Sequence, residues 1–269
     1  MRRNFKGFVE RNRWLKAVPN TLTVCNSLCG FLAILNTLQV YNKHTQTEYV
    51  FIISSCMILG AMVFDALDGF AARIFNAASL KGIQMDSLAD MVTFGVAPAV
   101  LVCVMAHKYS LTIYGYPMAW IFCAVYLAGA AHRLARYNVM TMLEKKSGHM
   151  FTGLPTPGGA AAICSIVFLV CSSKVDPHHQ IVRFLPFYAC ILGLLFVSNI
   201  KYAHFGKWLP TVRRNKLRLV LLIVVVIFII VQPAIGIAVV VNGYVIFHII
   251  AGIIRSLKFA TIKSHSHHS

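Results

Sequence analysis

The stretch VFDALDGFAARIFNAASLKGIQMDSLADMVTFGVAP, residues 63–98, sets four aspartates among apolar residues. These are Asp65, Asp68, Asp86 and Asp90, and the whole chain of 269 residues has only eight acidic residues. The neighbouring apolar runs are long enough to cross a lipid bilayer, where an isolated charge is strongly unfavourable. Acidic residues concentrated there indicate a functional site.

The composition predicts an all-α integral membrane protein. Hydrophobic residues make up 58% of the chain and charged residues 12%, and the mean hydropathy is +0.70. This is too little charge to cover the surface of a soluble domain. A bilayer core requires about 20 apolar residues per helix. We expect about eight transmembrane helices, at residues 20–40, 50–73, 84–107, 113–133, 155–172, 181–200, 217–232 and 235–254.

The boundary between the last two spans is the least defined. A tight turn at Gln232 and Pro233 would separate them, although residues 217–254 are also compatible with one broken segment.

The basic residues are distributed as the positive-inside rule requires. The formal net charge is +17. With a cytoplasmic N-terminus, 21 of the 25 Lys and Arg residues lie in cytoplasmic segments. Because there is no basic domain separate from the spans, we expect anionic lipid headgroups and no nucleic acid as partners of this charge.

The first acidic pair lies on one face of a helix. Residues advance by about 100° around a helix, so Asp65 and Asp68 point in similar directions. The same sector carries two small residues and, at its edge, a cation: Gly69, Ala72 and Arg73. The small residues leave room for a bulky ligand, and an arginine can bind a phosphate.

The second acidic pair has the same kind of arrangement. Asp86 and Asp90 share a helical stripe with Gly82. In a regular α-helix, this stripe continues through Thr93 and Ala97.

A short connection, residues 76–81, predicts that the two helices are antiparallel neighbours. Their acidic faces would then meet as a four-carboxylate cluster near the cytoplasmic end. One charge at mid-bilayer costs on the order of 3 kcal/mol, so four carboxylates require neutralisation. Hard divalent cations bind oxygen ligands, and the cluster suits one or two Mg²⁺ or Mn²⁺ ions. Two ions about 4 Å apart are an arrangement that stabilises phosphoryl transfer. Spacing alone is also compatible with salt bridges to Lys and Arg at the helix ends, or with an ion path.

The pattern over residues 65–90 is D-x2-D-G-x2-A-R-x8-G-x3-D-x3-D. It resembles the signature of the CDP-alcohol phosphotransferases, integral membrane enzymes of phospholipid synthesis. The resemblance implies a six-helix core and a two-metal site that opens to the cytoplasm. It also implies a reaction in which an alcohol attacks a CDP-linked donor and CMP leaves.

The resemblance also implies residue roles. The metal ions would be bound by Asp65, Asp68, Asp86 and Asp90. Asp90 would in addition be the catalytic base. The CDP moiety would be bound by Asn26, Asp68, Gly69, Ala72, Arg73 and Gly82. Asn26 lies in PNTLTVCNSLCG, residues 19–30, which is similar to the family's P-N-x-L-T-x2-N-x3-G, although a Pro-Asn pair is also an ordinary helix start.

Three further stretches are similar to the membrane-integral phosphatidylserine synthases: MDSLADMVTFGVAPA at 85–99, HRLARYNV at 132–139 and FTGLPTPGGAA at 151–161. This similarity implies CDP-diacylglycerol and L-serine as substrates. Arg133 and Arg136, on adjacent turns, would bind the donor phosphates or the serine carboxylate. Anchoring at the cytoplasmic surface explains the two arginines equally well.

We therefore expect three regions. Residues 1–18 would form a basic amphipathic interfacial helix, residues 19–200 the six-helix catalytic core, and residues 201–269 a basic cytoplasmic loop, two further spans and a cytoplasmic tail. The family resemblance implies a homodimer. Short loops and no recognisable targeting segment lead us to expect a bacterial inner membrane.

Two other functions remain open on the sequence. One keeps the chemistry but uses glycerol 3-phosphate, choline or inositol phosphate as the acceptor, by direct transfer or through a covalent intermediate. The other is a divalent-cation transporter, which would move metal without forming CMP. A transporter leaves Gly69, Ala72 and Arg73 unexplained.

Overall fold

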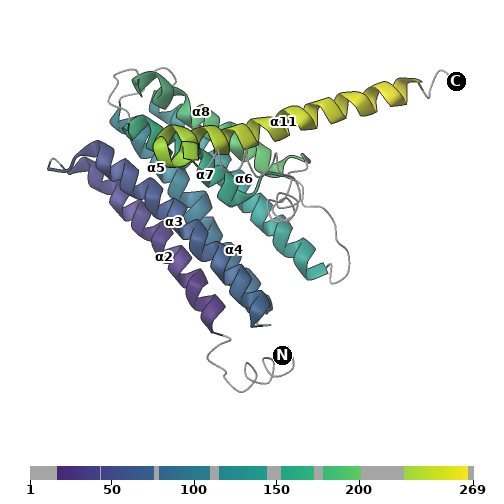
Figure 1. The fold of residues 1–269 in the computed structure, drawn as a ribbon, viewed down its shortest axis with the longest axis horizontal. Helices are drawn as coiled ribbons and strands as arrows, with labels where there is room; N and C mark the ends of the chain where they lie inside the picture. Colours follow the sequence, from purple (N-terminus) through teal and green to yellow (C-terminus); the bar gives the residue numbers. More distant parts are fainter. Residues whose placement is uncertain are drawn as a thin grey trace.

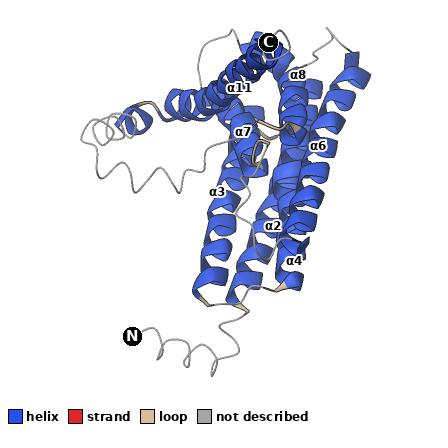
Figure 2. Cartoon of the chain, turned by 90° about the vertical axis from the view of Figure 1, so that its right-hand side faces the viewer, coloured by secondary structure: helices blue, strands red, loops and turns tan. Residues whose placement is uncertain are grey.

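The protein is described by a computed structural model that covers residues 17–42, 44–75, 79–109, 115–143, 153–172, 178–200 and 227–265. Within these residues all regular structure is helical, and most helices form an elongated bundle (Figures 1 and 2). The α-helices are α2 (Val18–Leu38), α3 (Thr47–Ile74), α4 (Leu80–Asp90), α5 (Ala97–Lys108), α6 (Gly115–Leu143), α7 (Thr156–Ser172), α8 (His178–Val197) and α11 (Pro233–His265). A 3₁₀ turn, Gln39–Tyr41, follows α2, and a π-helical turn η3, Met91–Val96, joins α4 to α5.

The helices confirm an all-α, multi-pass membrane protein. In the described part of the chain, five helical stretches are long and apolar enough to span a bilayer: Val18–Tyr41, Thr47–Ile74, Leu80–Lys108, Met118–Thr141 and Pro233–Gly252. Two shorter apolar helices, Thr156–Ser172 and Ile181–Val197, occupy the positions of two more predicted spans. The predicted span at 217–232 lies mostly outside the described residues, so the total of eight stays a prediction. The same holds for the interfacial helix and for the basic loop that begins at residue 201.

Helices α2 and α3 pack along each other through a buried polar network. The Asn36 Nδ2 atom donates to Ser54 Oγ and to Val50 O, both at 2.9 Å. The Thr37 hydroxyl also lies 2.9 Å from Ser54 Oγ. Hydrogen bonds between helices within apolar surroundings contribute to association in a membrane, where lipid is as apolar as the helix surfaces.

Helices α6 and α8 approach closely because glycines meet at their crossing. A Cβ atom on Gly193 would lie 2.6 Å from Tyr126 Cα, and one on Gly129 would collide with Gly193 O. Small residues at such crossings allow backbones to pack directly. Tyr126, which this packing encloses, is 0% exposed.

The C-terminal helix α11 crosses the end of the bundle instead of running parallel to the other helices (Figures 1 and 2). It packs against α7. The side chain of Asn242 links α11 to α7 and α8. Its Nδ2 donates to Ser165 Oγ at 3.0 Å, and its Oδ1 accepts from the Tyr188 hydroxyl at 2.6 Å. The predicted break is present, since the helix that precedes it ends at Val231 and α11 begins at Pro233.

Two details of the predicted acidic helices need correction. α3 and α4 do meet at one end of the bundle, but α4 packs mainly against α2 and contacts α3 little. The acidic stripe also does not continue as a regular α-helix through Thr93 and Ala97, because η3 intervenes after Asp90. An additional residue in that turn rotates the side chains that follow it.

Candidate active site and metal centre

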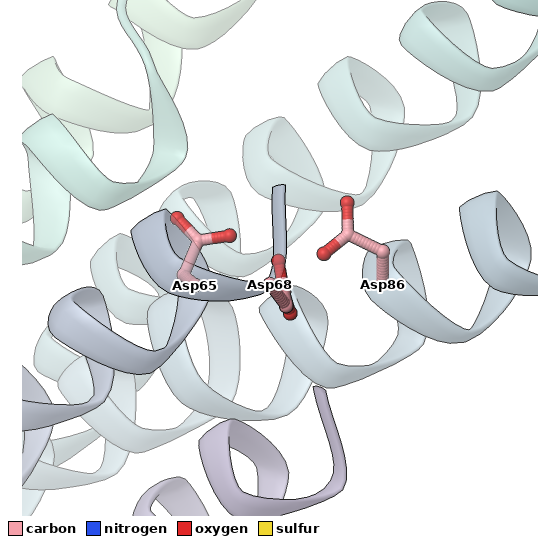
Figure 3. Close-up of side chains that lie close together, drawn as sticks. All are labelled: Asp65, Asp68 and Asp86. Atoms are coloured by element: carbon pink, nitrogen blue, oxygen red, sulfur yellow. The ribbon is translucent and has the colours of Figure 1, made fainter. Parts of the chain in front are cut away.

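Three aspartates converge between α3 and α4. One carboxylate oxygen each from Asp65, Asp68 and Asp86 lies within 4.8 Å of the others. Figure 3 shows these side chains side by side, two on α3 and one on α4. α4 packs mainly against α2 and has few contacts with α3, although the acidic side chains of α3 and α4 approach one another.

The start of α4 places Asp86 at this position. Ser79 is the N-cap, and its hydroxyl accepts a hydrogen bond from the Gly82 backbone N–H at 3.0 Å. Such a cap satisfies one of the donors left free at a helix start. Asp86 follows Gly82 by one helical turn. The two residues therefore share one face of α4, as the predicted stripe requires.

Asp90 lies next to this group, one turn farther along α4. Its side chain is 8% exposed, and Asn26 Nδ2 donates to its Oδ1 at 3.2 Å. Asp65 and Asp86 lie within electrostatic reach of it. The structure thus brings together all four predicted aspartates, three in a tight group and the fourth buried beside them.

Helix α2 supplies hydrogen-bond donors to two of the acids. Besides Asn26, Thr23 places its hydroxyl 2.8 Å from Asp68 Oδ2. Thr23 is 5% exposed and Asn26 is 0% exposed, so both contacts are shielded from solvent. Hydrogen bonds to an ionised carboxylate favour its charged form and fix its orientation.

The donor set fits a divalent cation. In the described part of the chain, Asp86 Oδ1 is buried and has no hydrogen-bond partner. Among the described residues, the side chain of Arg73 donates from Nε to Gly69 O on its own helix, at 2.9 Å, and to no carboxylate. A buried carboxylate oxygen without a donor must be neutralised by a proton or by a cation, and among cations Mg²⁺ and Mn²⁺ suit oxygen ligands. The salt-bridge interpretation of the cluster has no support from these contacts.

A pocket of about 120 Å³ adjoins the acidic group. Its lining residues come from the starts of α2 and α4 and the end of α3: Pro19, Asn20, Thr23, Asp68, Gly69, Ala72, Ser79, Gly82, Ile83 and Asp86. Gly69, Ala72 and Gly82, three of the residues predicted to bind CDP, line this pocket, and their contact with CDP stays a prediction. Asn26 is not on this wall but behind it, against Asp90. Arg73 is exposed.

Five lining residues were not predicted individually: Pro19, Asn20, Thr23, Ser79 and Ile83. The first three belong to the PNTLT segment, and the signal that could have found them is their match to fixed positions of the P-N-x-L-T pattern. Ser79 gives no such signal, because a helix-capping serine is common.

The two predicted arginines of α6 differ in their surroundings. Arg133 is half-buried, and its Nη1 donates to Thr156 Oγ1 at 2.9 Å, while its Nε is buried without a partner in the described residues. Asp90 lies within electrostatic reach of it. Arg136, one turn away, is exposed. Only Arg133 is thus directed into the helix bundle near the acidic group.

A comparison with protein families matches residues 16–198 to CDP-alcohol phosphatidyltransferases. The matched region includes the acidic group, the pocket and both arginines. The chain belongs to the CDP-alcohol phosphatidyltransferase family. The resemblance of the D-x2-D-G-x2-A-R motif is thereby confirmed.

Several curated relatives of this phosphatidyltransferase have one enzyme name in common. The chain is 29% identical to the CDP-diacylglycerol–serine O-phosphatidyltransferase of Helicobacter pylori (strain ATCC 700392 / 26695) over 248 residues, which cover 92% of this chain and 96% of the relative. It is 34% identical to the enzyme of that name from Bacillus subtilis (strain 168) over 191 residues, 71% of this chain and 92% of the relative. A third relative with this name, from Methanocaldococcus jannaschii, is 31% identical over 190 residues, 71% of this chain and 75% of the relative.

Proposed function

We propose that this phosphatidyltransferase transfers the phosphatidyl group of CDP-diacylglycerol to the hydroxyl of L-serine, forming phosphatidylserine and CMP. The observation that carries the proposal is the convergence of Asp65, Asp68 and Asp86 beside a pocket walled by the motif glycines. The relatives named CDP-diacylglycerol–serine O-phosphatidyltransferase support serine as the acceptor.

The cytidine diphosphate would lie in the pocket between α2, α3 and α4. Gly69 has no atom within 4 Å of the position that a Cβ would take, so this side of α3 is open to a ligand. Divalent ions held by the four aspartates, Mg²⁺ or Mn²⁺ and two in number, would neutralise the pyrophosphate charge. The acyl chains would remain in the bilayer.

Asp90 would act as the base. Its burial beside Asn26 holds one carboxylate oxygen in place. Asp90 would accept the proton of the serine hydroxyl while the hydroxyl oxygen bonds to the phosphorus that carries diacylglycerol. The bond from that phosphorus to the CMP oxygen breaks, and CMP leaves with its electron pair.

Arg133 is placed to bind the serine carboxylate or the donor phosphates. A guanidinium with a free, buried Nε–H can make charge-assisted hydrogen bonds to an anion, and Thr156 holds it in orientation. The exposed Arg136 would contact headgroups or the outer part of the donor.

The membrane arrangement is part of the proposal. The acidic group would lie on the cytoplasmic side of a bacterial inner membrane, and the distribution of Lys and Arg supports the cytoplasmic side. Residues 1–18 would lie at the interface, residues 19–200 would form the catalytic core, and residues 201–269 would add a basic loop, two spans and a tail. A homodimer is expected from the family resemblance.

Purified protein incubated with CDP-diacylglycerol, Mn²⁺ and a panel of alcohols tests the function. We expect CMP release with L-serine. CMP release with glycerol 3-phosphate, choline or inositol phosphate, and not with serine, would identify that alcohol as the acceptor. Metal flux across vesicles without CMP formation would show that the protein is a transporter and not this enzyme.

The replacement Gly69→Val tests the pocket. A valine there projects into the space assigned to cytidine, so we expect the KM for CDP-diacylglycerol to rise by about tenfold or more, a loss of about 1.4 kcal/mol of binding. Gly60→Val is the matched control, because Gly60 is on the same helix and also has no atom within 4 Å of its Cβ position. Equal effects of both replacements would show that helix α3, and not the pocket, is perturbed.

The pair Arg133→Ala and Arg136→Ala tests the acceptor side. We expect Arg133→Ala to lower kcat/KM for L-serine by about 10- to 100-fold, the effect of losing a hydrogen bond to a charged group. Arg136→Ala should have a much smaller effect, since Arg136 is exposed. The steady-state kinetics are measured at saturating CDP-diacylglycerol. A larger loss in Arg136→Ala would reverse the assignment.

A further inference from the structure

A π-helical turn follows Asp90 directly in the helix that carries Asp86 and Asp90. Met91–Val96 form this turn, and the Ala97 N–H donates to Val92 O, five residues earlier. One more residue in a turn rotates the following side chains by about 100° relative to an uninterrupted α-helix. The turn therefore sets how α4 is rotated relative to α5.

The orientation of α5 is determined by core packing. Leu101, Val102 and Met105 are all 0% exposed and belong to the main hydrophobic cluster. Rotating α5 would expose these side chains and place others in a close-packed interior. With α5 held in this way, the π turn decides the direction in which Asp86 and Asp90 point.

Pro98 explains why a π turn forms here. In a regular α-helix, residue 98 would donate to Phe94 O, but proline has no N–H and its ring collides with that carbonyl. Phe94 is 0% exposed, so its carbonyl needs another donor. The hydroxyl of Tyr126, on α6, donates to Phe94 O at 2.8 Å.

A second contact ties the turn to α2. Thr93 Oγ1 donates to Asn26 O at 3.0 Å. Gly30 allows this approach, because a Cβ there would lie 2.7 Å from Thr93 Cα. The side chain of the same Asn26 donates to Asp90. The backbone of Asn26 thus holds the π turn, and its side chain holds the acid that precedes the turn.

We propose that Tyr126 and Thr93 are positioning residues for Asp86 and Asp90. Through the carbonyl of Phe94 and the backbone of Asn26 they keep residues 91–96 in the π form, which turns both acids toward Asp65 and Asp68. Their effect on turnover rests on the proposed function. Their effect on the geometry of the acidic group does not.

Removing the two hydroxyl groups tests the proposal. Tyr126→Phe and Thr93→Val should each lower kcat by about 10- to 100-fold, the effect of a displacement near 1 Å at a reacting group. The KM for CDP-diacylglycerol should change less than kcat, because neither Tyr126 nor Thr93 lines the pocket. Thr93→Ser keeps the donor and should restore activity. Thr37→Val is the matched control, since it removes an equally buried hydroxyl that bridges α2 and α3 away from the turn.

Pro98→Ala tests the cause of the turn. Alanine restores the donor to Phe94 O, so the helix can become regular. We expect a thermal midpoint at or above that of the wild type together with a lower kcat. Tyr126→Phe alone should lower the midpoint, and in the Pro98→Ala background it should lower it no further.

A readout without substrate separates this proposal from the proposed function. Mn²⁺ should raise the thermal midpoint of the wild type and of Thr37→Val, and should raise it less in Tyr126→Phe, Thr93→Val and Pro98→Ala. Wild-type shifts and wild-type kcat in these three variants would overturn the positioning role. A wild-type protein that forms no CMP with any alcohol would contradict the proposed function, and the Mn²⁺ shifts would then decide the positioning role by themselves.

Discussion

Asp90→Asn is expected to lower CMP release from CDP-diacylglycerol and L-serine by about 10²- to 10⁴-fold, the range that a general base contributes. Asparagine has nearly the same shape and keeps an oxygen for the Asn26 donor, so packing around this buried position should survive. It cannot accept a proton from the serine hydroxyl and is a poorer metal ligand. The rate is measured as CMP formed by purified protein in detergent or vesicles.

Folding must be followed in the same Asp90→Asn protein. Without added metal, the replacement removes one of four mutually repelling charges, so the thermal midpoint should equal or exceed that of the wild type. Glu48→Gln, at the exposed start of α3, is the control for the loss of an acid away from the site. Activity close to that of the wild type in Asp90→Asn would show that Asp90 is not the catalytic base.

Chelation of divalent cations is expected to stop CMP release, and Mn²⁺ or Mg²⁺ should restore it. The physical reason is the group formed by Asp65, Asp68 and Asp86, whose oxygens lie within 4.8 Å of one another. Mn²⁺ binding to the folded state should also raise the thermal midpoint, with about 2.7 kcal/mol of stabilisation at a metal concentration 100 times the Kd.

Asp86→Asn separates a specific site from a general effect of metal on the membrane or detergent. Asp86 Oδ1 has no hydrogen-bond partner in the described residues, so its replacement should remove most of the Mn²⁺-induced shift. Glu48→Gln should keep the shift. Full turnover in metal-free buffer would be incompatible with a metal-dependent site.

Much of the acidic site could be predicted because helical periodicity is a local property. The spacings of Asp65 to Asp68 and of Asp86 to Asp90 place each pair on one face whatever the rest of the chain does. The short connection between the two helices then brings the pairs to the same end of the bundle. The positions of Gly69 and Gly82 on the pocket wall follow from the same periodicity.

The contacts made by α2 could not be predicted in this way. Thr23 and Asp68 are separated by 45 positions, and Asn26 and Asp90 by 64. Nothing in a local pattern states which helix fills the space beside α4. The preference of α4 for α2 over α3 results from packing across the whole bundle.

The sequence by itself determined the membrane-embedded helical class, the four acids and the faces on which they lie, because composition and periodicity act within single helices. Only the tertiary structure decided that Arg133 is half-buried on Thr156 while Arg136 is exposed. It alone also decided the rotation of α4 relative to α5. Pro98 removes a hydrogen bond locally, but the donor that replaces it, the Tyr126 hydroxyl, comes from another helix. A buried backbone carbonyl must find a donor, and which one it finds depends on how the helices pack.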